Sequence, residues 1–172
     1  MRRITSAVLG LLAFPVLGSA QDFDNVQIRT LQVSESIYVL QGSGGNIGVS
    51  IGDDGTFIVD DQFAPLTDKI VAAIRGISDE EIRFLINTHV HGDHTGGNEN
   101  LGRMGVLILA RDEVRVRLAA QSPENALPVL TYSEAITIHL NGGEVHAAPL
   151  PPPPAAGTSP AHARVPSFQF HV

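Results

Sequence analysis

Four side chains that bind metal ions lie within six residues near the middle of the chain: His89, His91, Asp93 and His94. Imidazole nitrogens and carboxylate oxygens are the ligands that zinc and related divalent ions take in proteins. Chance alone would place this pattern in fewer than about one in a thousand chains of this composition, so the motif predicts a metal site. It supplies two ligand pairs, which can begin a site for one ion or for two.

The spacing of these residues predicts how the two pairs are arranged. Side chains two residues apart in an extended segment point to the same side, so His89 and His91 should converge on one ion. Gly92 should permit a tight bend that directs Asp93 and His94 to a second point nearby. Two-metal hydrolases hold their ions roughly 3.5–4 Å apart around a shared hydroxide, which Asp93 could contact while it binds one ion.

The segments on both sides of the motif predict a mixed sheet with helices on its outer face. Residues 28–60 should form strands, because apolar and small residues alternate from 47 to 52, and Asp53-Asp54-Gly55 is typical of a hairpin turn. We expect helices at residues 65–75 and 111–119, and strands at 82–88, 106–109 and 136–140. The glycine-rich segment 42–46 is expected to be a loop and not a phosphate cradle, since no helix follows it.

Composition limits the classes of function. The chain has 172 residues, 43% of them hydrophobic, which suits one domain with a buried core. A formal net charge of −7 argues against nucleic acid as a partner, because phosphate binding needs clustered Lys and Arg. The absence of cysteine excludes disulfides, thiolate zinc sites and cysteine nucleophiles.

Residues 1–20 have the three parts of a secretory signal peptide: Arg2 and Arg3, an apolar stretch at 7–18, and small residues up to Ala20. The apolar stretch is shorter than the roughly 20 residues that span a bilayer. We therefore expect cleavage after Ala20, no stable membrane anchor afterwards, and a periplasmic or secreted protein. An uncleaved anchor or a first core helix is the alternative.

The chain changes character at residue 147. From there on it has no acidic residue and seven of its eleven prolines, including four in succession at 151–154. Consecutive prolines cannot belong to a central strand, and they favour a polyproline II or disordered tail. The expected organisation is a signal peptide at 1–20, a folded domain at 21–146 and a Pro/Ala-rich tail at 147–172.

The segment from Asn87 to Asn98, Asn-Thr-His-Val-His-Gly-Asp-His-Thr-Gly-Gly-Asn, resembles the signature loop of the metallo-β-lactamase superfamily. The resemblance covers about residues 28–146 and implies an αββα sandwich, of which this chain holds about the first half. It also implies up to two zinc ions, the first bound by His89 and His91 and the second by Asp93 and His94.

The same resemblance gives roles to further residues and implies an activity. It places Asp60 beside the metals as a supporting carboxylate, with a turn residue at the end of a strand as the alternative reading. Asp93 is the residue expected to contribute to catalysis. The implied reaction is hydrolysis of a small-molecule amide, lactone, ester or thioester by a metal-bound hydroxide.

The sequence also departs from the family. The family supplies a further histidine, a bridging acid and a final histidine on later loops, where this chain has its proline-rich tail. Four other histidines are not expected to replace them: His139, His146, His162 and His171. A frameshift in the gene, or a short paralogue, could explain the truncated appearance. Impaired hydrolysis is therefore expected, with a non-catalytic remnant or an iron-dependent redox protein as alternatives.

A domain reduced to half of a sandwich should expose the sheet face that normally packs on the other half. Soluble monomers rarely tolerate a large apolar patch of this kind. We therefore expect marginal folding, or self-association through the exposed sheet face by dimerisation or aggregation.

Overall fold

The computed structural model of the protein describes residues 22–149 and 169–171. The predicted signal peptide and most of the predicted tail, including His162, lie outside the described residues. None of the helices in the described part of the chain is long and apolar enough to cross a membrane.

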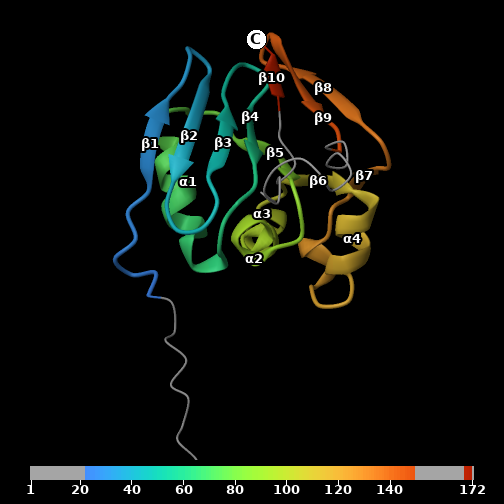
Figure 1. Cartoon of the computed structure of the whole chain (residues 1–172). Helices are drawn as coiled ribbons and strands as arrows, with labels where there is room; N and C mark the ends of the chain where they lie inside the picture. Colours follow the sequence, from blue (N-terminus) through green and yellow to red (C-terminus); the bar gives the residue numbers. More distant parts are fainter. Residues whose placement is uncertain (1–21, 150–168, 172) are drawn as a thin grey trace, which may run out of the picture.

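The structure is built on a seven-stranded mixed sheet, whose strands follow one another in sequence order from β1 to β7 (Figure 1). Strands β1 to β4 pair antiparallel, whereas β4 to β7 pair parallel. The strands are β1 (Arg29–Gln32), β2 (Ile37–Gln41), β3 (Ile47–Ser50), β4 (Thr56–Val59), β5 (Ile82–Asn87), β6 (Leu107–Arg111) and β7 (Leu130–Tyr132).

Helices cover one face of this sheet. They are α1 (Thr67–Arg75), α2 (Gly92–Thr95), α3 (Asn98–Arg103) and α4 (Asp112–Leu118). The apolar side of α1, including Ile70 and Ile74, packs on Val49, Ile58 and Leu85 of the central strands. The helix predicted at 65–75 begins two residues late, because Ala64–Leu66 forms a 3₁₀ turn that holds the proline.

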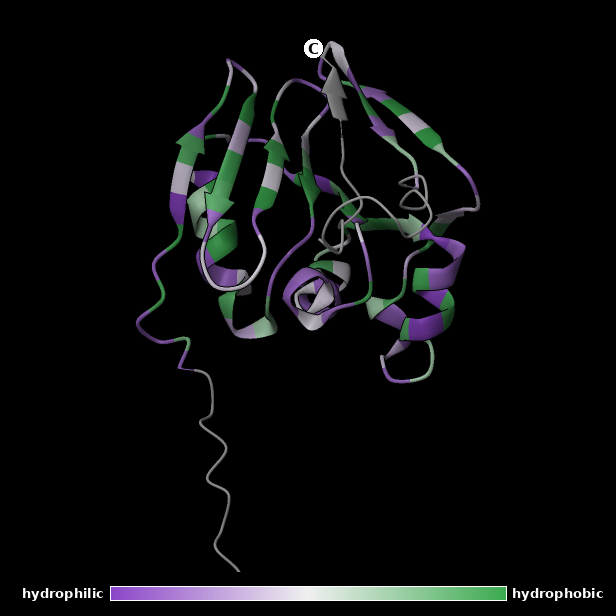
Figure 2. Cartoon of the chain, in the orientation of Figure 1, coloured by the Kyte–Doolittle hydropathy of each residue, from purple (hydrophilic) through white to green (hydrophobic). Residues whose placement is uncertain are grey.

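A small sheet covers part of the other face. It consists of β8 (Ile136–Leu140), β9 (Gly143–Ala147) and β10 (Gln169–His171), all antiparallel. The side chains of Leu140 and Val145 pack on Phe57 and Ile86 of the large sheet in a second apolar cluster. Figure 2 shows the hydrophobic residues concentrated on the strands, while α4 carries many hydrophilic ones.

The sheet face predicted to drive self-association is therefore partly covered. Phe57, Ile86 and Leu109 are buried beneath the small sheet, but Leu107 on β6 and Leu130 on β7 are 43% and 47% exposed. Self-association through this face stays a prediction.

The end of the chain adds one observation on the predicted tail. Ala147 ends β9, and Gln169–His171, which belong to the predicted tail, form β10 beside it. The boundary between residues 146 and 147 stays a prediction, because residues 150–168 lie outside the described part.

The topology brings three loops to one edge of the large sheet. Strands β4 and β5 are parallel, and β2 runs in the same direction as β4 because each is antiparallel to β3. The loops that follow β2, β4 and β5 therefore leave the sheet at the same edge. In open sheets of this kind, ligands bind at the carboxyl ends of the parallel strands. The predicted mixed sheet with outer helices is confirmed.

Candidate metal centre

The histidine motif leaves the sheet from the end of β5. This strand lies between β4 and β6, and its last three residues are buried, so its end is fixed by the core. The chain bends at residues 88–90, is extended at His91, and then makes the single turn α2. The backbone carbonyl of His91 accepts hydrogen bonds from the N–H groups of His94 and Thr95 at 2.9 and 3.1 Å.

The role predicted for Gly92 is wrong. Its φ does not lie in the left-handed region, and a Cβ added there would meet only Cε1 of Phe63, at 4.0 Å. The change of direction comes from the step between the extended His91 and the helical turn that begins at Gly92. An ordinary residue can adopt both conformations.

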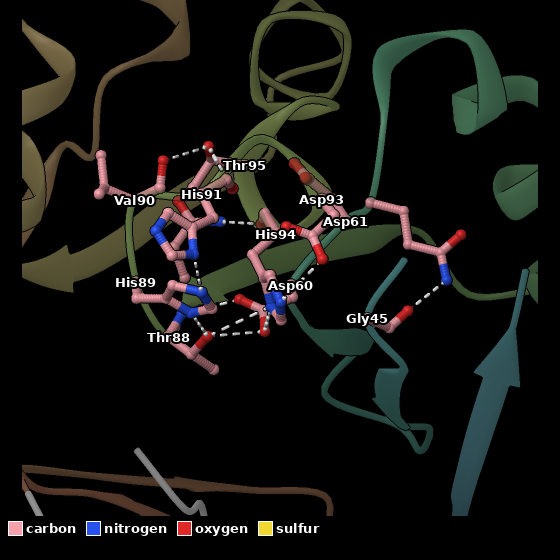
Figure 3. Close-up of polar contacts among 12 residues, drawn as sticks. Gly45, Asp60, Asp61, Thr88, His89, Val90, His91, Asp93, His94 and Thr95 are labelled. Atoms are coloured by element: carbon pink, nitrogen blue, oxygen red, sulfur yellow. Dashed lines mark hydrogen bonds and ion pairs between the residues drawn. The ribbon is translucent and has the colours of Figure 1, made fainter. Parts of the chain in front are cut away.

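The first ligand pair, His89 and His91, is brought together, although the chain bends at residues 88–90 and is not the extended segment that the spacing assumed. Nε2 of His89 lies 3.1 Å from Nδ1 of His91, and the two rings meet edge to face (Figure 3). On its other side, Nδ1 of His89 lies 2.8 Å from the hydroxyl of Thr88. Thr88 therefore fixes the His89 ring so that Nε2 faces His91.

The second ligand pair, Asp93 and His94, lies directly beside the first. Nε2 of His94 is 3.4 Å from Oδ2 of Asp93, and the His94 ring centroid is 4.0 Å from that of His89. The His94 side chain is only 14% exposed, against 34% for Asp93. All four predicted ligands therefore come together in one group.

Asp60 supports the second pair from the end of β4. Its Oδ2 accepts from Nδ1 of His94 at 2.7 Å and from the Thr88 hydroxyl at 2.8 Å, while Oδ1 accepts from the Thr88 N–H at 2.7 Å. The Nδ1 contact directs Nε2 of His94 toward Asp93, which is how carboxylates orient metal-binding histidines. Asp60 has a φ of 62°, a strained backbone conformation that clusters at functional sites.

The electrostatic environments of the histidines differ. Burial lowers the pKa of His89, and the neighbouring His94 lowers it further. Burial also acts to lower the pKa of His94, but the hydrogen bond that His94 donates to Asp60 and the charges of Asp60 and Asp93 outweigh it and raise that pKa overall. His89 is thus held in the neutral form that binds metals.

Two buried amide side chains, those of Asn87 and Asn98, lie at the two ends of the loop that carries the histidine motif. Asn87 at the end of β5 and Asn98 at the start of α3 exchange two side-chain hydrogen bonds at 3.0 and 2.9 Å. Asn87 also donates to the carbonyl of His94, and Asn98 to that of Ala126. Both residues belong to the quoted motif, but the sequence indicated no role for them or for Thr88.

Imidazole nitrogens and a carboxylate oxygen are ligands that zinc accepts. Within each pair the candidate ligand atoms face one another: Nε2 of His89 and Nδ1 of His91, and Nε2 of His94 and Oδ2 of Asp93. Catalytic zinc, however, is held by three protein ligands. Within residues 22–149 and 169–171, no group of three or more His, Asp or Glu side chains is arranged to hold one ion. The site as described therefore offers two half-sites.

The other histidines in the described part of the chain belong to the small sheet. His139 is 3.8 Å from Glu144 and His146 is 2.9 Å from Thr137, all on the hairpin of β8 and β9. Neither histidine joins the group at the end of β5. His171 lies on β10, paired in register with Glu144.

Solved structures share this fold. The metallo-beta-lactamase from Pontibacter korlensis superposes with a TM-score of 0.60 and 17% identity, over 72% of this chain and 60% of that chain. A metallo-beta-lactamase from Cronobacter sakazakii with a HARLDQ motif gives 0.62 and 18%, over 71% and 52%. The DIM-1 metallo-beta-lactamase gives 0.58 and 24%, over 70% and 58%. The chain thus spans little more than half the length of these structures.

Comparison of the sequence itself agrees. Among curated proteins, none matches the chain. A family model described as the metallo-beta-lactamase superfamily matches residues 36–160, which is most of the chain and includes the whole histidine motif. From its signature loop, its fold and this match, the chain belongs to the metallo-beta-lactamase superfamily.

Proposed function

We propose that this protein is a zinc-dependent hydrolase of a small molecule that carries an amide, lactone, ester or thioester bond. The observation that carries the proposal is the arrangement of four donor side chains in two adjoining pairs. Supporting contacts turn one nitrogen of His89 toward His91 and one nitrogen of His94 toward Asp93. A purely structural group of polar residues would not require these orientations.

The residues have separate roles in this proposal. His89 and His91 would hold one ion, and Asp93 and His94 a second one. Zinc, when bound, supplies the acidity that makes water a nucleophile at neutral pH. Asp93 is partly exposed and has a carboxylate that can accept a hydrogen bond from the attacking water and orient it. Asp60 keeps His94 in position through Nδ1.

A second candidate is a non-catalytic protein that binds metal weakly or not at all. The observation that favours it is the set of only two ligands for each ion in the described residues. Two ligands hold zinc much less tightly than three or four, since each lost ligand must be replaced by water.

Metal content separates the two candidates. The full-length protein, purified in zinc-containing buffer and dialysed, is analysed for metals beside the His89→Ala/His94→Ala double variant and the control His139→Ala. We expect about two zinc ions per chain in the wild type and the control, the stoichiometry of a two-metal hydrolase. Zinc-loaded protein that also opens a chromogenic lactam, lactone or thioester supports the hydrolase. Absence of zinc supports the second candidate.

We also propose that the protein acts in the periplasm or outside the cell. The support is the charged, apolar and small-residue order of residues 1–20. N-terminal sequencing of protein recovered from the periplasm or medium should begin at Gln21. A sequence that begins at Met1 in that material contradicts the proposal.

A further inference from the structure

The glycine-rich segment 42–46 lies directly against the second ligand pair, a position that the proposed function leaves unexplained. A Cβ built on Gly45 would lie 2.5 Å from Cε1 and 2.8 Å from Nε2 of His94. One built on Gly44 would lie 2.6 Å from Cβ of Asp93, and Gly44 also has a φ of 87°. These glycines therefore allow the backbone of the loop to touch both ligands.

The side chain of Gln62 holds this loop in place. Its Oε1 accepts a hydrogen bond from the backbone N–H of Ser43 at 3.2 Å, and its Nε2 donates to the carbonyl of Gly45. Gln62 is completely buried, so these contacts are protected from competing water. A Cβ on Gly42 would lie 2.5 Å from Oε1, so the amide also needs a glycine there.

The backbone around Gln62 supports a functional interpretation. Gln62 has a φ of 56°, and Asp60 two residues before it has a φ of 62°. Non-glycine residues in this region are strained and persist only where their surroundings over-determine them. The two strained residues direct one side chain to His94 and the other to the loop that lies on His94.

We propose that Gln62 is a positioning residue that latches the glycine loop against Asp93 and His94. The loop lies against the His94 ring at Cε1 and Nε2, beside the nitrogen that faces Asp93, and it limits access to this pair. Release of the loop gives the His94 and Asp93 side chains freedom that they must lose again when an ion binds. The expected effect on metal binding rests on the proposed function. The role of Gln62 in holding the loop 42–46 does not depend on it.

The test uses full-length protein with the substitution Gln62→Gly. Glycine adopts a positive φ without strain, so the variant loses the amide while its backbone conformation is favoured. Gln62→Asn is the second variant, since Asn tolerates this conformation but its amide is one methylene too short. The matched control is Asn141→Gly. Asn141 has a φ of 53°, and its side chain also clasps a backbone turn, with bonds to the N–H of Asp54 and the carbonyl of Gly55, away from the metal motif.

Two measurements are made on each protein: hydrogen exchange of the peptide that contains residues 42–46, and zinc affinity by competition with a chromophoric chelator. Both Gln62 variants should exchange roughly five- to tenfold faster at this peptide, as expected for loss of about one net hydrogen bond. They should bind zinc roughly three- to tenfold more weakly, the effect of mobilising one or two side chains. Asn141→Gly should change neither quantity.

Other results overturn the inference. Unchanged exchange in the Gln62 variants, or an equal rise in Asn141→Gly, excludes the latch. Faster exchange with unchanged zinc affinity excludes the positioning role. A wild type that binds no zinc contradicts the proposed function, and the exchange data then decide the latch alone.

Discussion

The two ligand pairs are neighbours in space but are supported in different ways. His89 and His91 are held by each other and by Thr88, all within one short segment, and His91 is exposed. His94 is largely buried and donates a hydrogen bond from Nδ1 to the carboxylate of Asp60. It also contacts the glycine-rich loop 42–46, which Gln62 holds in place.

The second pair, Asp93 and His94, is therefore arranged before any ion binds, whereas an ion must help to order the first pair, His89 and His91. Fixing one side chain costs about 0.5–1.5 kcal/mol, so a prearranged pair keeps more of its binding energy. The same support makes the second pair dependent on the loops after β2 and β4, far from it in sequence. Substitutions outside the motif should therefore affect Asp93 and His94 more than His89 and His91.

The largest expected effect is that of Asp60→Ala. It removes the acceptor of three partly buried hydrogen bonds, from the Thr88 N–H, the Thr88 hydroxyl and His94 Nδ1. We expect a loss of about 3 kcal/mol in the free energy of unfolding. Each hydrogen bond to a charged group contributes about 1.5–3 kcal/mol, but the total is smaller than the sum because the groups left behind can rearrange and find other partners. Loss of a supporting carboxylate should weaken zinc binding about 10- to 100-fold.

Urea unfolding and chelator competition measure these two effects. Asp60→Asn serves as a comparison, because its amide oxygen can still accept from the Thr88 N–H, while its NH2 group cannot accept from the Thr88 hydroxyl or from His94 Nδ1. Zinc affinity equal to that of the wild type in the Ala variant would mean that Asp60 does not support the second pair.

The next largest effect compares two glycines. Gly45→Ala places a methyl group 2.5 Å from the His94 ring, so the loop or the ring must move. Overpacking of this kind costs about 1–3 kcal/mol. Gly92→Ala meets only a side-chain atom at 4.0 Å and lies in the first turn of a helix, where alanine is favoured by up to about 1 kcal/mol.

Thermal unfolding with and without zinc checks both variants. The expected order is a lower Tm for Gly45→Ala and an equal or higher Tm for Gly92→Ala. The reverse order would show that the motif glycine, and not the loop glycine, is the residue under steric constraint.

The contrast between these glycines also shows what the sequence could predict. The apolar run 82–88 correctly indicated a strand, and the rings of His89 and His91 meet, although the chain bends at residues 88–90 instead of staying extended. Such properties are local: they depend on periodicity within a few residues. The bend assigned to Gly92 failed because an extended residue followed by a helical turn changes direction without a special φ.

The sequence pattern could not predict contacts between residues that are far apart in the chain. Gly45 needs to be glycine because of His94, which is about fifty residues away in the chain. The loop 61–64 could be predicted to line a cleft, but nothing distinguished Gln62 within it, since glutamine is usually a surface residue. The helix α3 was also missed, because Asn98–Arg103 is short and contains a glycine.

A smaller effect concerns pH. Asp61 lies between the two strained residues, accepts from the Gly97 N–H, and has no partner in the described residues for its buried Oδ2. Burial raises the pKa of Asp61 well above its ordinary 3.8. The folded state thus holds the proton more tightly than the unfolded state. Its contribution to stability is complete below about pH 4 and is lost as the pH rises through the folded pKa.

Asp61→Asn mimics the protonated form at every pH. Relative to the wild type, its free energy of unfolding should rise between pH 4 and pH 7, reaching a gain of about 1 kcal/mol, the scale of one poorly satisfied buried polar group. Urea titrations at several pH values measure this. A difference that stays constant with pH would show that Asp61 is ionised in the folded protein throughout.

The smallest effect on stability should come from removing a ligand of the exposed pair. The His91 side chain bonds only to Nε2 of His89 among the described contacts, so His91→Ala should change the free energy of unfolding by less than about 0.5 kcal/mol. Its effect on zinc should nevertheless be large, because His89 alone remains to hold the first ion. Zinc stoichiometry measured together with urea unfolding separates the two quantities. If His91→Ala destabilised the fold as much as Asp60→Ala, the first pair would be part of the structural frame, and the distinction between a prearranged and an open pair would fail.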